Sequence, residues 1–78
     1  MNYLLSGELV YTTAKAKDAS GQDEYIGLAL PGSSKADPVW QIKKLTYDGA
    51  GFITDIQFAD SDAGFFYVWN DRTSYVYG

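Results

Sequence analysis

Polar turns interrupt this chain at short and regular intervals, and this spacing limits what the chain can fold into. Turn-forming residues gather at positions 18–23, 48–51, 59–64 and 70–73, and a longer loop with two prolines spans 31–38. Breaks that recur about every 8–12 residues suit short strands joined by turns. No ten-residue stretch between them carries an apolar period of 3.6, so long amphipathic helices are excluded. The spacing predicts a small antiparallel β structure.

The segments between the turns have the composition of strands. The chain has seven tyrosines, four phenylalanines and two tryptophans, together with many valines, isoleucines and threonines. Aromatic and β-branched side chains pack well on a pleated surface. We expect an all-β fold, a small antiparallel sheet folded as a sandwich or a partly open barrel of about five or six strands. The expected strands span 9–14 (extending to 17), 24–30, 39–47, 52–58, 65–69 and 74–77.

Alternation gives two of these strands distinct faces. In 24–30, Ile26 and Leu28 lie on one face, and Gly27 and Ala29 lie on the other. Side chains this small predict that another part of the protein packs closely over their face.

In 39–47, the two pairs of large apolar residues have opposite parity. Trp40 and Ile42 share one face, whereas Leu45 and Tyr47 alternate onto the other. A β-bulge near 43–44 would bring all four side chains to the same side, and we expect one there.

Length and missing residue types exclude whole classes of function. The chain has 78 residues, which predicts a single domain over 1–78. It has no cysteine and no histidine, so disulfides, thiolate metal sites and the usual general base are absent. We expect no catalytic activity, no cofactor and no metal. The run from Asp60 to Gly64 lacks the closing glutamate and flanking helices of a calcium loop, and it is expected to be a solvated turn.

Charge and hydropathy exclude two kinds of partner. Six basic residues stand against ten acidic ones, a net charge of −4, and no basic stripe is present for nucleic acid. No apolar run approaches the roughly 18 residues of a membrane-spanning helix. Residues 1–5 lack the basic flank and apolar stretch of a signal peptide. Neither nucleic acid nor membrane is therefore expected as a partner.

The aromatic residues near the C-terminus are the candidate binding residues. Aromatic rings carry much contact area and are enriched in interfaces, although they also form cores and can stack on sugars. Arg72, the single arginine, is expected to pair with Asp60, Asp62 or Asp71, with a partner's carboxylate as the alternative. The predicted partner-binding residues are Trp40, Tyr67, Trp69, Tyr75 and Tyr77, together with the loop from Pro31 to Pro38.

Three segments of the second half form a recognisable pattern. They read DPVWQIKKLTY at 37–47, IQFAD at 56–60 and VWNDRTSY at 68–75, with Phe66 between the last two. This pattern resembles small tailed-bacteriophage proteins encoded among virion genes. That group has glycine after the Ala-Asp step, where this chain has Ser61. The resemblance implies a structural role in the virion.

A small β domain without disulfides or metals gains stability by burying a face against a partner. Together with the resemblance, this predicts a structural component of a tailed-phage virion, associated with the tail or neck or decorating the capsid. It would act by protein–protein packing and strand addition. Its expected partners are other virion proteins in a homo-oligomer or multi-copy assembly, put together in the bacterial cytoplasm and retained in the virion. The alternatives are a carbohydrate-binding attachment module and a small phage inhibitor of a host enzyme.

Overall fold

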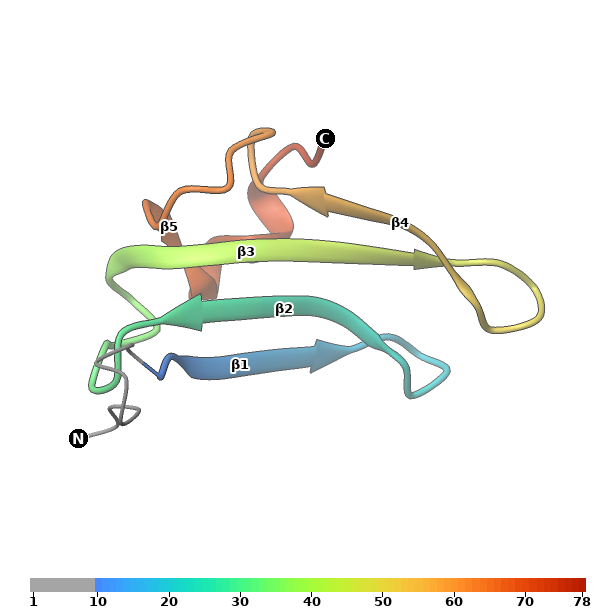
Figure 1. Ribbon diagram of the computed structural model, residues 1–78, viewed down its shortest axis with the longest axis horizontal. Helices are drawn as coiled ribbons and strands as arrows, with labels where there is room; N and C mark the ends of the chain where they lie inside the picture. Colours follow the sequence, from blue (N-terminus) through green and yellow to red (C-terminus); the bar gives the residue numbers. More distant parts are fainter. Residues whose placement is uncertain (1–9) are drawn as a thin grey trace.

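The computed structural model describes residues 10–78 and confirms the all-β prediction (Figure 1). Its strands are β1 (Thr12–Lys17), β2 (Asp23–Ala29), β3 (Pro38–Tyr47), β4 (Ile53–Phe58) and β5 (Tyr67–Val68), followed by a 3₁₀ helix, η1 (Trp69–Ser74). The antiparallel sheet has the order β1-β2-β3-β4, and β5 pairs with β3. The sheet is open, with β1 and β4 at its edges among the described residues.

The β1–β2 and β3–β4 hairpins close with the same turn. The Asp18 carboxylate accepts hydrogen bonds from the backbone amides two and four residues further on, at 2.9 and 3.0 Å. Asp48 repeats both contacts at 2.9 and 3.0 Å. Gly21 and Gly51 adopt φ angles of 85° and 87°, a region that glycine enters without a steric penalty. These aspartate and glycine positions explain why the turns could be predicted.

The C-terminal residues form a second layer over one face of the sheet, and η1 lies behind the strands in Figure 1. Gly27 makes this close approach possible, because a Cβ atom there would lie 2.6 Å from Trp69 Cε3 and 3.0 Å from Trp40 Cε3. The predicted close packing over Gly27 is confirmed. The buried core on this covered face comprises Ala14, Tyr25, Ala29, Trp40, Ile42, Ala59 and Trp69.

The prediction of a β-bulge near 43–44 is wrong. β3 pairs in continuous register with β2 from Gln41 to Lys44 and with β4 from Lys43 to Thr46. The register shift comes instead between Thr46 and Tyr47, beside the glycine-containing turn, where such turns commonly place a bulge. Leu45 therefore faces away from the side that carries the buried tryptophans.

The strands expected at 65–69 and 74–77 are mostly replaced by other structure. Only two residues form β5, and η1 occupies 69–74. Ser74 Oγ donates to the carbonyl of Asp71 at 2.6 Å, a local bond through which such side chains compete with strand pairing. The last residues keep one isolated bridge, between Ala59 and Tyr77. The predicted strand start at Leu9 and the prediction for residues 1–5 lie outside the described residues.

Tyr77 is held inside the covered layer by its ring and its hydroxyl. The hydroxyl donates to the carbonyl of Arg72 at 2.7 Å, and the ring lies 5.6 Å from that of Tyr25. Burial raises the pKa of Tyr77 strongly, and burial with a hydrogen bond to Asp62 raises the pKa of Tyr67 to about 12. Both shifts favour the neutral phenol in the folded chain.

The raised pKa values predict a loss of stability in alkali. Above pH 10.0, the ordinary value for tyrosine, the unfolded chain ionises first, so the free energy of unfolding falls as the pH rises toward the folded-state values. Tyr77→Phe should cost about 1 kcal/mol at neutral pH through the lost hydrogen bond, and it should flatten the alkaline decline. Urea unfolding at neutral pH and above pH 10 measures both effects, with Tyr11→Phe as the control for an exposed hydroxyl. An unchanged alkaline slope in Tyr77→Phe would contradict the assignment.

Candidate protein-interaction face

The aromatic residues predicted to bind a partner lie on or beside the covered face. Trp40 and Trp69 are 2% and 4% exposed, so neither offers a ring to a partner in this fold. The cause is Gly27, which leaves space that both indoles fill. Trp40 Nε1 also donates to the carbonyl of Ser34 at 2.9 Å, which fastens the proline-containing loop to the core.

The other predicted contact residues have different surroundings. Tyr67 and Tyr75 are half-buried and pack edge to face, with ring centroids 5.1 Å apart, and the Tyr75 hydroxyl accepts a hydrogen bond from the Val68 amide at 2.9 Å. Pro31 and Pro38 are exposed at the two ends of their loop. Partner contact through these residues and through Tyr77 stays a prediction.

The sequence predicted an ion pair between Arg72 and an aspartate, and this prediction is wrong. Its guanidinium carbon lies 4.8 Å from the Trp69 ring centroid and 6.0 Å from that of Tyr25, and Nη1 donates to the Trp69 carbonyl at 3.3 Å. Within residues 10–78, the ion pairs involve Asp23 with Lys15 and with Lys17. Arg72 therefore stabilises the covered layer by cation–π packing.

The opposite face of the sheet carries a second set of apolar side chains, which we call the open face. Because directly opposed residues share a face, the register identifies its members. One row across the strands runs Lys15, Ile26, Lys43 and Phe58, and the next rows pair Thr13 with Leu28 and Leu45 with Ile56. The apolar members of the open face are Ile26, Leu28, Leu45, Ile56 and Phe58.

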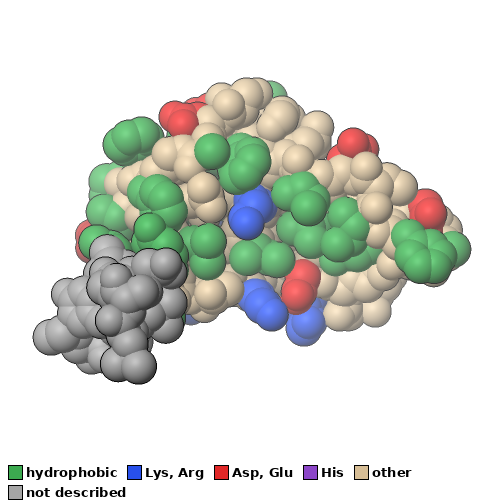
Figure 2. All heavy atoms as spheres, viewed as in Figure 1, with side chains coloured by type: hydrophobic (Ala, Val, Ile, Leu, Met, Phe, Trp, Pro, Cys, Tyr) green, Lys and Arg blue, Asp and Glu red, His purple; other side chains and the backbone are tan. Residues whose placement is uncertain are grey.

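The open face is apolar at its centre and basic in part. Figure 2 looks onto this face and shows hydrophobic side chains gathered across the sheet, with basic side chains among them and acidic ones mostly toward the rim. Ile56 is 55% exposed. Lys43 lies between Ile26 and Phe58, and among residues 10–78 no carboxylate lies within ion-pair distance of it. A partner surface that is apolar with a carboxylate opposite Lys43 would match this arrangement.

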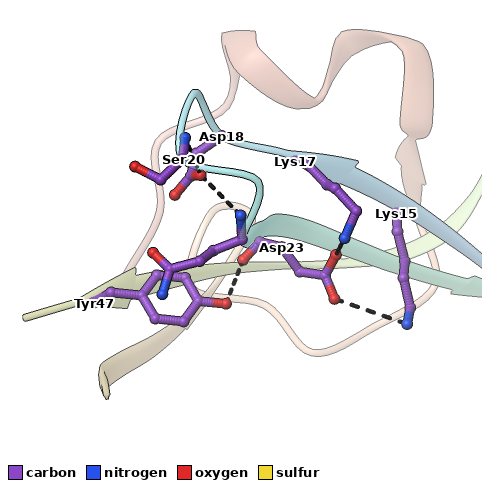
Figure 3. A network of polar contacts seen from close by, with 7 residues as sticks. Lys15, Lys17, Asp18, Ser20, Asp23 and Tyr47 are labelled. Atoms are coloured by element: carbon purple, nitrogen blue, oxygen red, sulfur yellow. Dashed lines mark hydrogen bonds and ion pairs between the residues drawn. The ribbon is translucent and has the colours of Figure 1, made fainter. Parts of the chain in front are cut away.

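A polar network fixes the β1–β2 end of the same face (Figure 3). Asp23 contacts Lys17 Nζ at 2.9 Å and Lys15 Nζ at 3.8 Å. The hydrogen bond from Lys17 is the main cause that lowers the pKa of Asp23. The Tyr47 hydroxyl donates to the Asp23 carbonyl at 2.7 Å, which ties the two hairpins together at this end. The network holds the two hairpins together at this end of the open face.

A smaller apolar pocket lies near the proline-containing loop. Tyr11 and Phe65 stack there, with ring centroids 5.3 Å apart and planes inclined by 21°. Leu30, Ser33 and Val39 complete its lining. The sequence pointed to this region only through the loop itself.

The acidic residues after β4 form the predicted hydrogen-bonded turn. The Asp62 carboxylate accepts a hydrogen bond from the Gly64 amide at 2.7 Å and another from the Tyr67 hydroxyl at 3.0 Å. Asp60 and Ser61 adopt left-handed φ angles of 51° and 58°, so Ser61 occupies a position that favours glycine. Among residues 10–78, no group of three carboxylates could hold a metal ion.

Comparisons with known proteins add no relative to this description. No protein-family model, curated protein or solved structure matches the chain. Among residues 10–78, no helix has the length and apolar character needed to cross a bilayer. The site must therefore be interpreted from its own geometry, in which a partly exposed apolar sheet face is the most prominent feature.

Proposed function

We propose that the protein is a structural component of a tailed-phage virion that packs its open face against another virion protein. The observation that carries the proposal is the apolar surface formed by Ile26, Leu28, Ile56 and Phe58, which stays partly exposed among the described residues. A sheet with an apolar face is stable when a second layer buries that face. The covered face has its layer among the described residues, and we infer that a partner supplies the layer over the open face.

The chemistry of the chain and the pattern in its second half support this role. The chain lacks histidine and cysteine, and the ion pairs among residues 10–78 form a surface network between β1 and β2. The proposal therefore gives the protein no catalytic role. The resemblance to small virion-associated phage proteins supplies the setting, in the tail or neck or on the capsid. Burial of Trp40 and Trp69 takes the two tryptophan rings away from the surface that a carbohydrate-binding module would use.

The proposal is tested on particles purified from infected host cells and washed at high salt. Quantitative mass spectrometry should find the wild-type chain at a fixed ratio to the major virion proteins. Leu28→Lys, on the open face, should lower its incorporation by roughly tenfold or more, because burial of a leucine contributes about 1.5–3 kcal/mol. Val76→Lys is the matched control, since Val76 is 79% exposed and lies outside the open face.

Circular dichroism verifies that both variants are folded. The role in the virion is contradicted if the wild-type chain is absent from washed particles. Use of the open face is contradicted if folded Leu28→Lys enters the particles as well as the wild type does.

A further inference from the structure

The β3–β4 hairpin presents an exposed aromatic ring. Phe52 follows the turn and is 70% exposed. Both of its backbone groups are fixed, because the Phe52 amide donates to the Asp48 carboxylate at 3.0 Å and the Asp48 amide donates to the Phe52 carbonyl at 2.9 Å. The ring is therefore held on a preorganised backbone, which lowers the cost of placing it in a binding site.

The turn itself does not require an aromatic residue. In the matching β1–β2 turn, Gln22 occupies the position of Phe52. The Gln22 amide donates to the Asp18 carboxylate at 3.0 Å, and the Asp18 amide donates to the Gln22 carbonyl at 2.8 Å. A polar residue thus closes the same turn with the same hydrogen bonds. Neither the turn nor burial explains Phe52, so its ring is available for contact with another molecule.

An apolar cavity of about 350 Å³ lies near the proline-containing loop. Its lining comprises Tyr11, Leu30, Ser33, Val39 and Phe65, none of which is charged. The Ser33 hydroxyl already donates to the carbonyl of Leu30 at 2.7 Å, so it does not need a polar ligand. An apolar cavity of about 150 Å³ can hold a benzene ring. The cavity therefore has the size and the chemistry to accept a phenyl ring, which would pack beside Tyr11 and Phe65.

The ring and the cavity lie at opposite ends of β3. Val39, in the cavity lining, is near the start of the strand, and Phe52 follows the turn beyond its end at Tyr47. Figure 1 shows the β2–β3 loop and the β3–β4 turn at the two ends of the sheet. Eight residues of strand separate Val39 from Tyr47 by about 26 Å. Phe52 therefore cannot fill the cavity of its own chain, whereas the cavity of a second copy can receive it.

Charges near the two ends are partly complementary. Asp48 and Asp55 precede and follow Phe52 in the hairpin and are exposed, whereas no carboxylate lines the cavity. The loop that contributes Ser33 to the lining carries exposed Lys35, with Asp37 as its other charged residue. A hairpin that enters the cavity with Asp48 toward Lys35 pairs opposite charges at the rim.

We propose that Phe52 of one copy inserts into the cavity between the β2–β3 loop and Phe65 of the next copy, so that copies of the chain join head to tail. The contact is heterologous, because ring and cavity are different surfaces and each copy keeps one of each for further copies. Such a contact builds a closed ring or a filament, depending on the rotation between copies. The inference goes beyond the proposed function, because it assigns a second copy as partner and uses residues outside the apolar members of the open face.

The contact is small, so it is weak between two free copies. One aromatic side chain buries about 150–250 Å². Each partner in a stable pairwise interface buries about 800 Å². Association should therefore be visible in concentrated solutions of the free protein, and it should become strong where an assembly holds many copies side by side.

The first test measures self-association of the full chain by NMR, at physiological salt to screen the repulsion between copies of net charge −4. As the protein concentration rises, the ring signals of Tyr11 and Phe65 should shift and diffusion should slow. Phe52→Gln reproduces the β1–β2 turn, so it should fold normally and weaken association by roughly tenfold to a hundredfold. Val76→Gln, at an apolar residue that is 79% exposed, is the matched control and should associate like the wild type. Spectra of the wild type that do not change with concentration, or equal association of folded Phe52→Gln, would overturn the inference.

The second test separates a head-to-tail contact from a symmetric one. Leu30→Lys places a charge in the cavity lining at a residue that is 50% exposed, and it keeps Phe52 intact. Each variant alone should remain monomeric. An equimolar mixture should form a one-to-one complex and grow no further, because the ring of Leu30→Lys enters the cavity of Phe52→Gln and the other two ends are blocked. A mixture that stays monomeric, or variants that each still dimerise, would contradict the proposed contact.

This outcome is independent of the proposed function. If the chain enters washed particles through its open face but its free copies never associate through Phe52, the inference fails and the proposed function stands. If the chain associates head to tail but is absent from washed particles, the proposed function fails and the inference stands.

Discussion

Gly27→Ala is expected to lower the free energy of unfolding by about 3 kcal/mol. The added methyl group would lie 2.6 Å from Trp69 Cε3 and 2.8 Å from Cζ3, which is closer than real Cβ atoms approach ring carbons. The Trp40 ring blocks retreat on the other side, at 3.0 Å. Either η1 must lift from the sheet or the strands must separate, and both responses expose the core. Urea unfolding followed by circular dichroism measures the change.

Gly49→Ala is the matched control for Gly27→Ala. Gly49 lies in a hairpin turn, no heavy atom lies within 4 Å of a Cβ built there, and its φ is not in the left-handed region. The control should stay within about 0.5 kcal/mol of wild type. A Gly27→Ala variant as stable as Gly49→Ala would show that η1 does not pack on β2 as described.

Trp69→Ala is expected to lower the free energy of unfolding by more than Gly27→Ala does. Removing a buried indole costs about 3–5 kcal/mol through lost burial and the cavity left behind. A core in a domain of this size supplies a net stability of about 3–5 kcal/mol, so the variant should be largely unfolded at room temperature. Loss of signal dispersion in NMR spectra of the variant would report this collapse. Trp69 also supports Arg72, whose guanidinium rests on its ring, so the covered layer loses a second contact.

Two further variants show whether the effect comes from the core contact. Trp69→Phe keeps an aromatic ring over Gly27 and should remain folded with reduced stability. Phe66→Ala removes a ring that is 69% exposed and should change the free energy of unfolding by less than about 0.5 kcal/mol. If Trp69→Ala unfolds at the same urea concentration as Phe66→Ala, Trp69 does not belong to the core.

Local features of the sequence predicted the hairpins and the packing site correctly. Asp18 and Gly21, like Asp48 and Gly51, specify a turn through their own backbone preferences, independently of the rest of the fold. Gly27 marked a close approach because only a missing side chain leaves room for one. Such signals act over a few residues, so they can be interpreted without knowledge of tertiary contacts.

The choice of covered face could not be predicted in the same way. Alternation separates Ile26 and Leu28 from Gly27 and Ala29, but it does not say which set receives the second layer. The large apolar set of β2 lies on the open face, and the small set lies beneath the tryptophans. In β3 the bulge expected near 43–44 would have placed Leu45 beside the tryptophans, whereas continuous register places it on the open face, where it is 8% exposed. In the sequence, the open face was indicated only by the alternation that separates Leu45 from Trp40 and Ile42.

The prediction of strands in the C-terminal segment was wrong because alternation of aromatic residues is typical of strands. Trp69 to Ser74 form a 3₁₀ helix instead, stabilised by local bonds such as Ser74 Oγ to the Asp71 carbonyl. Rings that were expected to contact a partner consequently fold back onto the sheet. Tertiary contacts with Gly27 and Tyr25 decide this arrangement, and they join residues more than forty positions apart in sequence.

Thiol footprinting tests most directly whether the open face is the contact surface, because a chain without cysteine gives a clean background. Thr13→Cys places one thiol on the open face beside Leu28, and Thr73→Cys places a matched thiol on the exposed side of η1. In the free protein both thiols should react with a maleimide reagent. In washed particles we expect strong protection of position 13 and continued labelling of position 73. Equal labelling of the two positions in particles, or protection of position 73 alone, would contradict the account.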